Sequence, residues 1–104
     1  MLQIGEDYVD RTVELPVGQV MELRLGENPT TGFRWQLKSD GGPACALEGD
    51  TFQPKAAAPG GGGEHSWQFR GVRAGDCEIE LLYRRRWENA PASRSFKVHV
   101  QVKG

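Results

Sequence analysis

The most chemically reactive side chains in this sequence are two cysteines and two histidines: Cys45, Cys77, His65 and His99. A cysteine and a histidine can act as a nucleophilic pair only where the thiol and the imidazole touch. The apolar alternation places His99 on the outward face of the last predicted strand and Cys77 on the inward face of its own. The four residues also lack the short paired spacings of zinc ligands. We therefore expect no enzyme activity, no metal site and no cofactor.

The two cysteines are too few for a disulfide-framework mini-protein, and they do not form a CxxC pair. Cys77 alternates with Ile79, Leu81 and Tyr83, so its expected role is that of a small core residue. A bridge between Cys45 and Cys77 stays open as an alternative, because the sequence does not give the distance between their α-carbons.

Two unusual segments suggest phosphate or nucleic-acid binding, but neither has the context it needs. The glycine run of residues 60–63 lacks the lysine and hydroxyl residue of a P-loop, and no helix follows it. The arginines at 84–86 have no basic stripe beside them, and the net charge is −1. We expect neither nucleic acid nor a membrane as a partner, since no apolar run approaches the ~20 residues of a membrane span. The chain as given shows no signal peptide, and the sequence leaves the compartment open.

The rest of the chain is patterned as short strands, because apolar and polar residues alternate between clusters of turn residues. The predicted strands cover residues 11–15, 20–25, 33–38, 64–70, 77–83 and 96–102, with a weaker edge strand at 44–52 that is interrupted at 48–50. The third strand is expected to bury Phe33, Trp35 and Leu37, and Trp67 is a second core tryptophan. This pattern predicts an all-β, immunoglobulin-like antiparallel β-sandwich of about seven strands. With 104 residues, of which 38% are hydrophobic, we expect a single domain over 1–104.

Three connections stand out by composition: residues 26–32, 53–63 and 84–93. They are the second, fourth and sixth connections of the predicted sandwich, so they should share one end of it. The middle one contains the glycine run and is expected to be mobile over residues 55–63. Three special loops at one end of a rigid sandwich resemble the binding surface of an antibody variable domain.

The first of these loops has a conformationally special sequence, Asn-Pro-Thr-Thr-Gly-Phe, at residues 28–33. Pro29 fixes its own φ and pushes Asn28 toward an extended conformation, while Gly32 can adopt a positive φ. Such a loop loses little entropy when a partner clamps it. The same residue types also occur in ordinary hairpin connections, so the hexapeptide alone does not decide between the two.

Three motifs in order resemble those of the chagasin family of cysteine protease inhibitors. They are the hexapeptide 28–33, a glycine-rich loop followed by Glu64 and His65, and Tyr83 with Arg85 and Trp87. The first motif matches the family pattern in full. The second, GxGG, fits either residues 59–62 or residues 60–63. The third departs from the family's Arg-Pro-Trp, because Arg86 stands where the proline is usual.

This resemblance implies reversible, tight-binding inhibition of papain-like (clan CA) cysteine proteases by a monomer whose loops 26–33, 59–64 and 84–90 block the active-site cleft. Thr31 and Gly32 would sit nearest the catalytic thiolate, and Trp87 would anchor the interface. The implied protease-binding residues are Asn28, Pro29, Thr30, Thr31, Gly32, Phe33, Gly60, Gly61, Gly62, Gly63, Arg85, Arg86 and Trp87. The alternative is a non-inhibitory immunoglobulin-like adhesion or ligand-binding module, the default function for the architecture alone.

Overall fold

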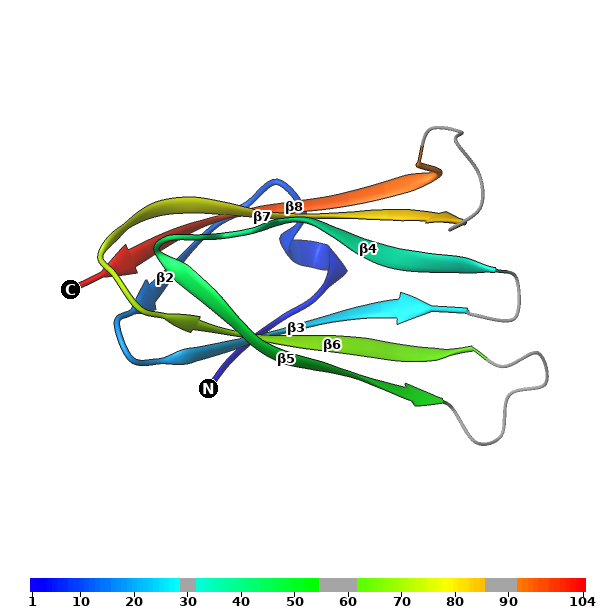
Figure 1. Cartoon of the computed structure of the whole chain (residues 1–104), viewed down its shortest axis with the longest axis horizontal. Coiled ribbons are helices and arrows are strands. Elements are labelled where there is room, and N and C mark those ends of the chain that lie inside the picture. The colour runs from blue at the N-terminus through cyan, green and yellow to red at the C-terminus, as the bar shows by residue number, and fades with distance from the viewer. Residues whose placement is uncertain (29–31, 55–61, 86–91) are drawn as a thin grey trace.

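The computed structural model of the chain describes residues 1–28, 32–54, 62–85 and 92–104 (Figure 1). Its elements in these ranges are β1 (Leu2–Ile4), the 3-10 turn η1 (Glu6–Tyr8), β2 (Thr12–Pro16), β3 (Val20–Glu27), β4 (Phe33–Asp40), β5 (Cys45–Pro54), β6 (Gly63–Gly71), β7 (Gly75–Arg85) and β8 (Arg94–Lys103). No helix in the described part of the chain has the length and apolar character needed to cross a membrane.

The strands form two four-stranded sheets that pack face to face (Figure 1). The order is β1-β3-β6-β5 in one sheet and β2-β8-β7-β4 in the other. Neighbouring strands are antiparallel except at two edges, where β1 pairs with β3 and β2 pairs with β8 in parallel. The predicted immunoglobulin-like sandwich is confirmed. The N-terminal segment closes one edge of each sheet, which leaves β4 and β5 at the opposite edges.

The core lies between the sheets and is filled by every second residue of the strands. The least exposed large side chains are Phe69, Leu15, Met21, Leu23, Leu25, Ile79, Leu81, Val98 and Val100. Burial of such a side chain contributes about 1.5–3 kcal/mol relative to its exposed state. Trp35, Trp67 and Cys77 are buried with them, so the predicted core tryptophans and the predicted core role of Cys77 are confirmed.

The sequence-based reading was wrong about several element boundaries. β1, which buries Ile4, was missed because a three-residue strand is too short to show alternation. Residues 84 and 85 continue β7, and Gly63 opens β6, so the connections at 84–93 and 53–63 are shorter than expected. Cross-strand pairing supplies the reason, since Phe33 lies opposite Arg85 and Glu27 lies opposite Gly63.

The two edge strands next to one another in the sandwich also differ from expectation. Leu37 is 36% exposed rather than buried, because β4 is the edge strand of its sheet. Leu37 still lies opposite the buried Leu81, and the register of β4 against β7 shifts only after it, between Leu37 and Ser39. β5 is longer than predicted and runs without a break. The expected interruption at 48–50 is a register shift between Leu47 and Gly49 in its pairing with β6.

Candidate functional site

Three pairs of strand ends meet at one end of the sandwich, and each pair flanks one segment outside the described residues (Figure 1). The pairs are β3 with β4, β5 with β6, and β7 with β8. Gly63 pairs with both Glu27 and Pro54, and Tyr83 pairs with Arg94. We call the described residues at these strand ends the rim.

The rim contains part of the predicted protease-binding set. Asn28, Gly32, Phe33, Gly62, Gly63 and Arg85 belong to it. Pro29, Thr30, Thr31, Gly60, Gly61, Arg86 and Trp87 lie outside the described residues, as does the start of the second motif at residue 59.

Glu27 is the buried charge of the rim, and it joins strands of both sheets. Its side chain has no exposed surface, because it continues the inward row of β3. Oε2 accepts a hydrogen bond from the Trp35 backbone N–H at 2.7 Å, and Oε1 lies 3.0 Å from Nδ1 of His65. Arg34 adds an ion pair at 3.5 Å. Burial of a carboxylate is costly unless it is paired and hydrogen-bonded, and these contacts meet that requirement.

His65 extends the hydrogen-bond network from Glu27 to β5, the edge strand of the sheet. Its Nε2 lies 2.6 Å from Oδ2 of Asp50 in β5, so the imidazole is held between two carboxylates. A protonated imidazole donates to both, whereas a neutral one donates to one. The ring also stacks on Trp67 at a centroid distance of 4.0 Å. The hydrogen-bonded network of Glu27, His65 and Asp50 therefore connects the end of β3 to β6 and β5, next to the described ends of the first and second motifs.

An aromatic cluster braces the other side of the rim. The Tyr83 ring lies 5.5 Å from the Phe33 ring and 4.9 Å from the Trp35 ring, centroid to centroid. The Tyr83 hydroxyl accepts a hydrogen bond from the Asn28 backbone N–H at 3.1 Å. The Arg85 guanidinium lies over the Phe33 ring at 4.6 Å, which is cation–π geometry. These contacts tie the first motif to the end of β7, which leads into the third.

Trp35 and Arg94 extend this cluster. The Trp35 indole N–H donates to the carbonyl of Gly26 at 2.8 Å, which links β4 of one sheet to β3 of the other. The Arg94 guanidinium lies 5.5 Å from the Trp35 ring centroid and pairs with Glu6 at 2.8 Å. The start of β8, on the far side of the third motif, is therefore fixed as well.

Two glycines of the motifs have distinct structural requirements. Gly32 has φ +82°, so the predicted positive φ is confirmed. Gly63 is buried, and a Cβ there would lie 2.5 Å from the Gln53 carbonyl oxygen and 2.6 Å from Cζ of Phe52. Its missing side chain lets β5 and β6 lie close together where they enter the second motif.

The described residues contain no arrangement for catalysis or metal binding. The sulfur atoms of Cys45 and Cys77 contact each other, while the histidines contact carboxylates. No group of three or more His, Cys, Asp or Glu within these ranges could hold a metal ion. The arrangement at the rim instead fixes the strand ends that flank the three motifs.

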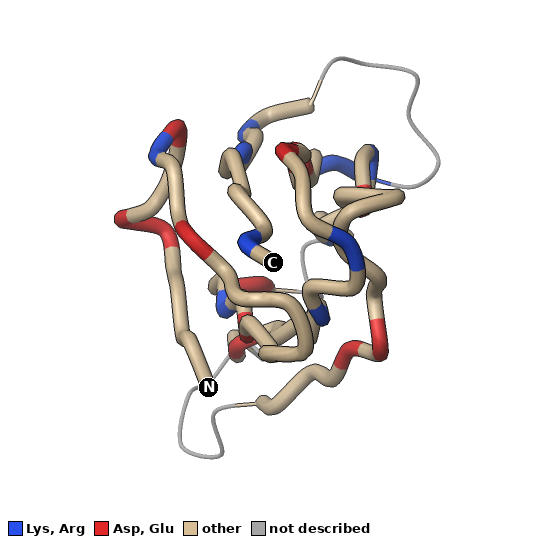
Figure 2. Tube along the Cα trace, turned by 90° about the vertical axis from the view of Figure 1, so that its left-hand side faces the viewer, with Lys and Arg blue, Asp and Glu red and all other residues tan. Residues whose placement is uncertain are grey.

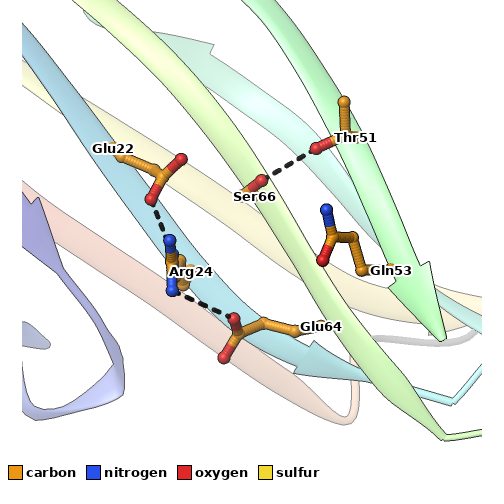
Figure 3. Close-up of a pocket in the computed structure, with 6 residues that line it drawn as sticks. All are labelled: Glu22, Arg24, Thr51, Gln53, Glu64 and Ser66. Carbon is orange, nitrogen blue, oxygen red and sulfur yellow. Dashed lines mark hydrogen bonds and ion pairs between the residues drawn. The ribbon is translucent and has the colours of Figure 1, made fainter. Parts of the chain in front are cut away.

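A shallow polar hollow lies on the outward face of β3, β5 and β6, away from the core (Figure 3). Arg24 pairs there with Glu22 at 2.6 Å and with Glu64 at 3.7 Å. Burial alone would raise the pKa of Glu22, but hydrogen bonds from Arg24 and Gln68 hold that pKa below its ordinary value. At the end opposite the rim, positive and negative residues are likewise interspersed (Figure 2). Neither surface has the concentration of charge of one sign that is typical of an electrostatic binding site.

Comparison with known proteins decides the family. The family model described as "Chagasin family peptidase inhibitor I42" matches residues 14–100. The chain belongs to the chagasin family of peptidase inhibitors. The match spans β2 to β8, and the family is one of inhibitors rather than enzymes.

Relatives and solved structures agree with this assignment. Amoebiasin-1 of Entamoeba histolytica is 31% identical over 101 residues, which cover 97% of this chain and 99% of that protein. A crystal structure of a cysteine protease inhibitor from Entamoeba histolytica has a TM-score of 0.88 at 22% identity, over 98% of this chain and 95% of the other. The structure of PbICP-C in complex with falcipain-2 has a TM-score of 0.63 at 20% identity, over 97% and 89% of the two chains. At these identities the two structures share the fold with this chagasin-family chain.

Sequence reasoning missed the residues that hold the rim together. Glu27 and His65 were not singled out as buried, although alternation alone indicates it. Glu27 follows Met21, Leu23 and Leu25 at a spacing of two, and His65 precedes Trp67 and Phe69 at the same spacing. A charged residue that continues a buried apolar row is the signal that would have found this network.

Proposed function

We propose that this chagasin-family chain reversibly inhibits papain-like cysteine proteases by occupying the active-site cleft with three segments that leave the rim. The observation that carries the proposal is the convergence of three pairs of strand ends, each flanking one family motif, at one end of the sandwich. The solved relatives support the target class: one is a cysteine protease inhibitor, and the other is bound to falcipain-2.

In this proposal the contact residues are those of the three motifs. They are Asn28, Pro29, Thr30, Thr31, Gly32, Phe33, Gly60, Gly61, Gly62, Arg85, Arg86 and Trp87. Gly63, which is buried in β6, supports the second motif from below. Thr31 and Gly32 approach the catalytic thiolate, and the second and third motifs grip the cleft on either side. We also propose that residues 1–104 act as one domain and as a monomer.

The contacts of the rim explain how such a surface could bind tightly. Both flanks of the first motif are fixed, since Asn28 N–H donates to Tyr83 and Glu27 is bonded to His65 and to the Trp35 backbone. Fixing a loop before it binds removes part of the entropy cost of association. Three loops can supply an interface of about 800 Å² per partner. A nanomolar complex would then correspond to about −12 kcal/mol.

Inhibition of papain by the purified chain tests the proposal. We expect reversible inhibition in which the chain stays uncleaved, with no effect on a serine protease such as trypsin. Thr31→Ala and Trp87→Ala should each weaken inhibition by about 30-fold or more, as expected for interface hot spots of about 2 kcal/mol, without unfolding the chain. Glu14→Ala, at an exposed position of β2, is the matched control and should inhibit like the wild type.

A lack of inhibition of several papain-like proteases at micromolar concentration would overturn the proposal and favour a non-inhibitory binding module. A Trp87→Ala variant that loses stability but inhibits normally would contradict the contact role of Trp87 and make it a packing residue.

A further inference from the structure

Cys45 and Cys77 form a buried thiol pair across the core, and the proposed function makes no use of them. Their Sγ atoms lie 3.5 Å apart, and the residues are 3% and 9% exposed. Cys45 is the first residue of β5, in one sheet, and Cys77 is the third residue of β7, in the other. The contact therefore joins the two layers of the sandwich rather than neighbours within one sheet.

We propose that Cys45 and Cys77 are the site of an inter-sheet disulfide, which forms when the chain folds in contact with a small-molecule disulfide such as oxidised glutathione. The sulfur atoms are already in van der Waals contact, so bonding needs them to approach by about 1.5 Å to reach the ~2.05 Å of an S–S bond. Two cysteines on facing strands of a sandwich core can supply this approach by small side-chain rotations.

The turn before β5 leaves room for these rotations. The Cys45 backbone N–H donates to the Gly41 carbonyl at 2.9 Å, which folds the turn against the sulfur pair. A Cβ on Gly41 would lie 3.1 Å from the Cys45 Cβ and 3.4 Å from the Cys77 Sγ, and the φ of Gly41 is +81°. A glycine at this position keeps the space beside the Cys45 Cβ and the Cys77 sulfur free of a further side chain.

The chemistry balances as two thiol–disulfide exchanges. One protein thiolate attacks a sulfur of oxidised glutathione and forms a mixed disulfide, which releases one glutathione thiolate. The second protein thiolate then attacks the protein sulfur of this mixed disulfide and releases the second glutathione. Two protein thiols are oxidised, one glutathione disulfide is reduced to two thiols, and the two protons pass to the departing thiolates.

Burial determines when this exchange can occur. Burial raises the pKa of the Cys45 thiol to about 12, with a further contribution from its contact with Cys77, and burial also raises the pKa of Cys77. In the folded protein at neutral pH both groups are therefore thiols, which are poor nucleophiles and are shielded from glutathione. The bond should form during folding, and the reduced native protein should oxidise slowly.

The bond would lie far from the rim. Cys45 is separated from Pro54, the last residue of β5, by the length of the strand, and Cys77 is separated likewise from Arg85. At ~3.3 Å per residue these lengths are about 30 Å and about 26 Å. The disulfide should therefore stabilise the sandwich without changing the surface proposed to bind proteases.

Refolding of the full chain in glutathione redox buffers tests this inference, because the thiols are accessible in the unfolded state. In excess oxidised glutathione we expect a product that resists alkylation after denaturation and is lighter by two hydrogen atoms. Its melting temperature should exceed that of the reduced protein by about 15–20 °C, since the bond closes a loop of about 33 residues. Cys45→Ala and Cys77→Ala should not form this product, and both should keep a melting temperature that does not change with the redox buffer.

The inference fails if the refolded wild type keeps both thiols open to alkylation, or if the oxidised form melts below the reduced one. These readouts do not involve a protease, so they are independent of the proposed inhibition. A separate inhibition assay on the two forms should give equal inhibition constants, and a loss of inhibition in the oxidised form would contradict the remote position of the bond.

Discussion

Replacement of Glu27 by alanine and by glutamine should have very different costs, because the two variants leave different groups unpaired. In Glu27→Ala the Trp35 backbone N–H loses its acceptor, and the His65 imidazole loses its partner at Nδ1 while Nε2 keeps its contact with Asp50. Each buried polar group left without a partner costs about 1–3 kcal/mol, and loss of one member of a buried ion pair costs about 3–5 kcal/mol. The free energy of unfolding should fall by about 3–5 kcal/mol, out of a total of about 5–15 kcal/mol.

Glu27→Gln should cost less, because the two buried groups that Glu27 contacts, the Trp35 N–H and the His65 ring, can still be paired. The amide oxygen can accept from the Trp35 N–H, and the amide nitrogen can donate to Nδ1 of a neutral His65 whose Nε2–H faces Asp50. What is lost is the charge assistance of two hydrogen bonds, at about 1 kcal/mol each, together with the ion pair to the half-exposed Arg34. We expect a decrease of about 2 kcal/mol.

Urea unfolding followed by tryptophan fluorescence measures these differences, since Trp35 and Trp67 are buried. Glu14→Ala, in which an exposed glutamate is removed, should stay within about 0.5 kcal/mol of the wild type. The reasoning is refuted if Glu27→Ala lies within about 1 kcal/mol of the wild type, or if the glutamine variant is destabilised as much as the alanine variant.

Three further predictions follow from the rim and from the core. Tyr83→Phe keeps the stacked ring but removes the acceptor of the Asn28 N–H. The free energy of unfolding should therefore fall by about 0.5–1.5 kcal/mol in the same urea experiment. An unchanged value would show that this hydrogen bond contributes nothing to stability. Gly63→Ala should lower the free energy of unfolding by about 1–3 kcal/mol, because the new Cβ would overlap Phe52 and the β5 backbone. Gly49→Ala is the control and should be close to neutral, because a Cβ on Gly49 would have nothing within 4 Å. Equal losses in the two variants would contradict the packing argument. Because the pKa of Cys45 is raised in the folded protein, the unfolded chain releases the thiol proton at a lower pH than the folded protein does. The free energy of unfolding should therefore decrease as the pH rises from about 9 toward about 12. The decrease should be smaller in Cys45→Ala. An identical pH dependence in the variant would remove Cys45 as its cause.

The sequence predicted the sandwich because its strands alternate cleanly. Apolar residues at every second position of β3 and β8 can be buried only on one face of a sheet, and the structure buries them there. The prediction was poorest at the edges. The exposure of Leu37 follows from the position of β4 at the edge of its sheet, and the order of the strands is a property of the assembled sheet that the pattern of one strand does not reveal.

The three motifs of the candidate site could be predicted from the sequence, but the contacts that fix the strand ends beside them could not. The unusual residues of the first motif are adjacent in the sequence, so they were visible directly. The support of that motif depends on contacts between residues far apart in the chain, such as Asn28 with Tyr83 and Glu27 with His65. Only the folded sheets bring those residues together, which is why the sequence pattern indicated the proposed binding segments and not the network at the strand ends that flank them.

A crystal structure of the chain bound to papain is the most direct test of the central claim. The account predicts that residues 28–33 lie over the catalytic cysteine, that the glycine-rich and tryptophan-bearing segments contact the cleft on either side, and that the chain is intact. A complex in which the cleft is open, or in which papain is held by the polar outward face of β3, β5 and β6, would contradict it.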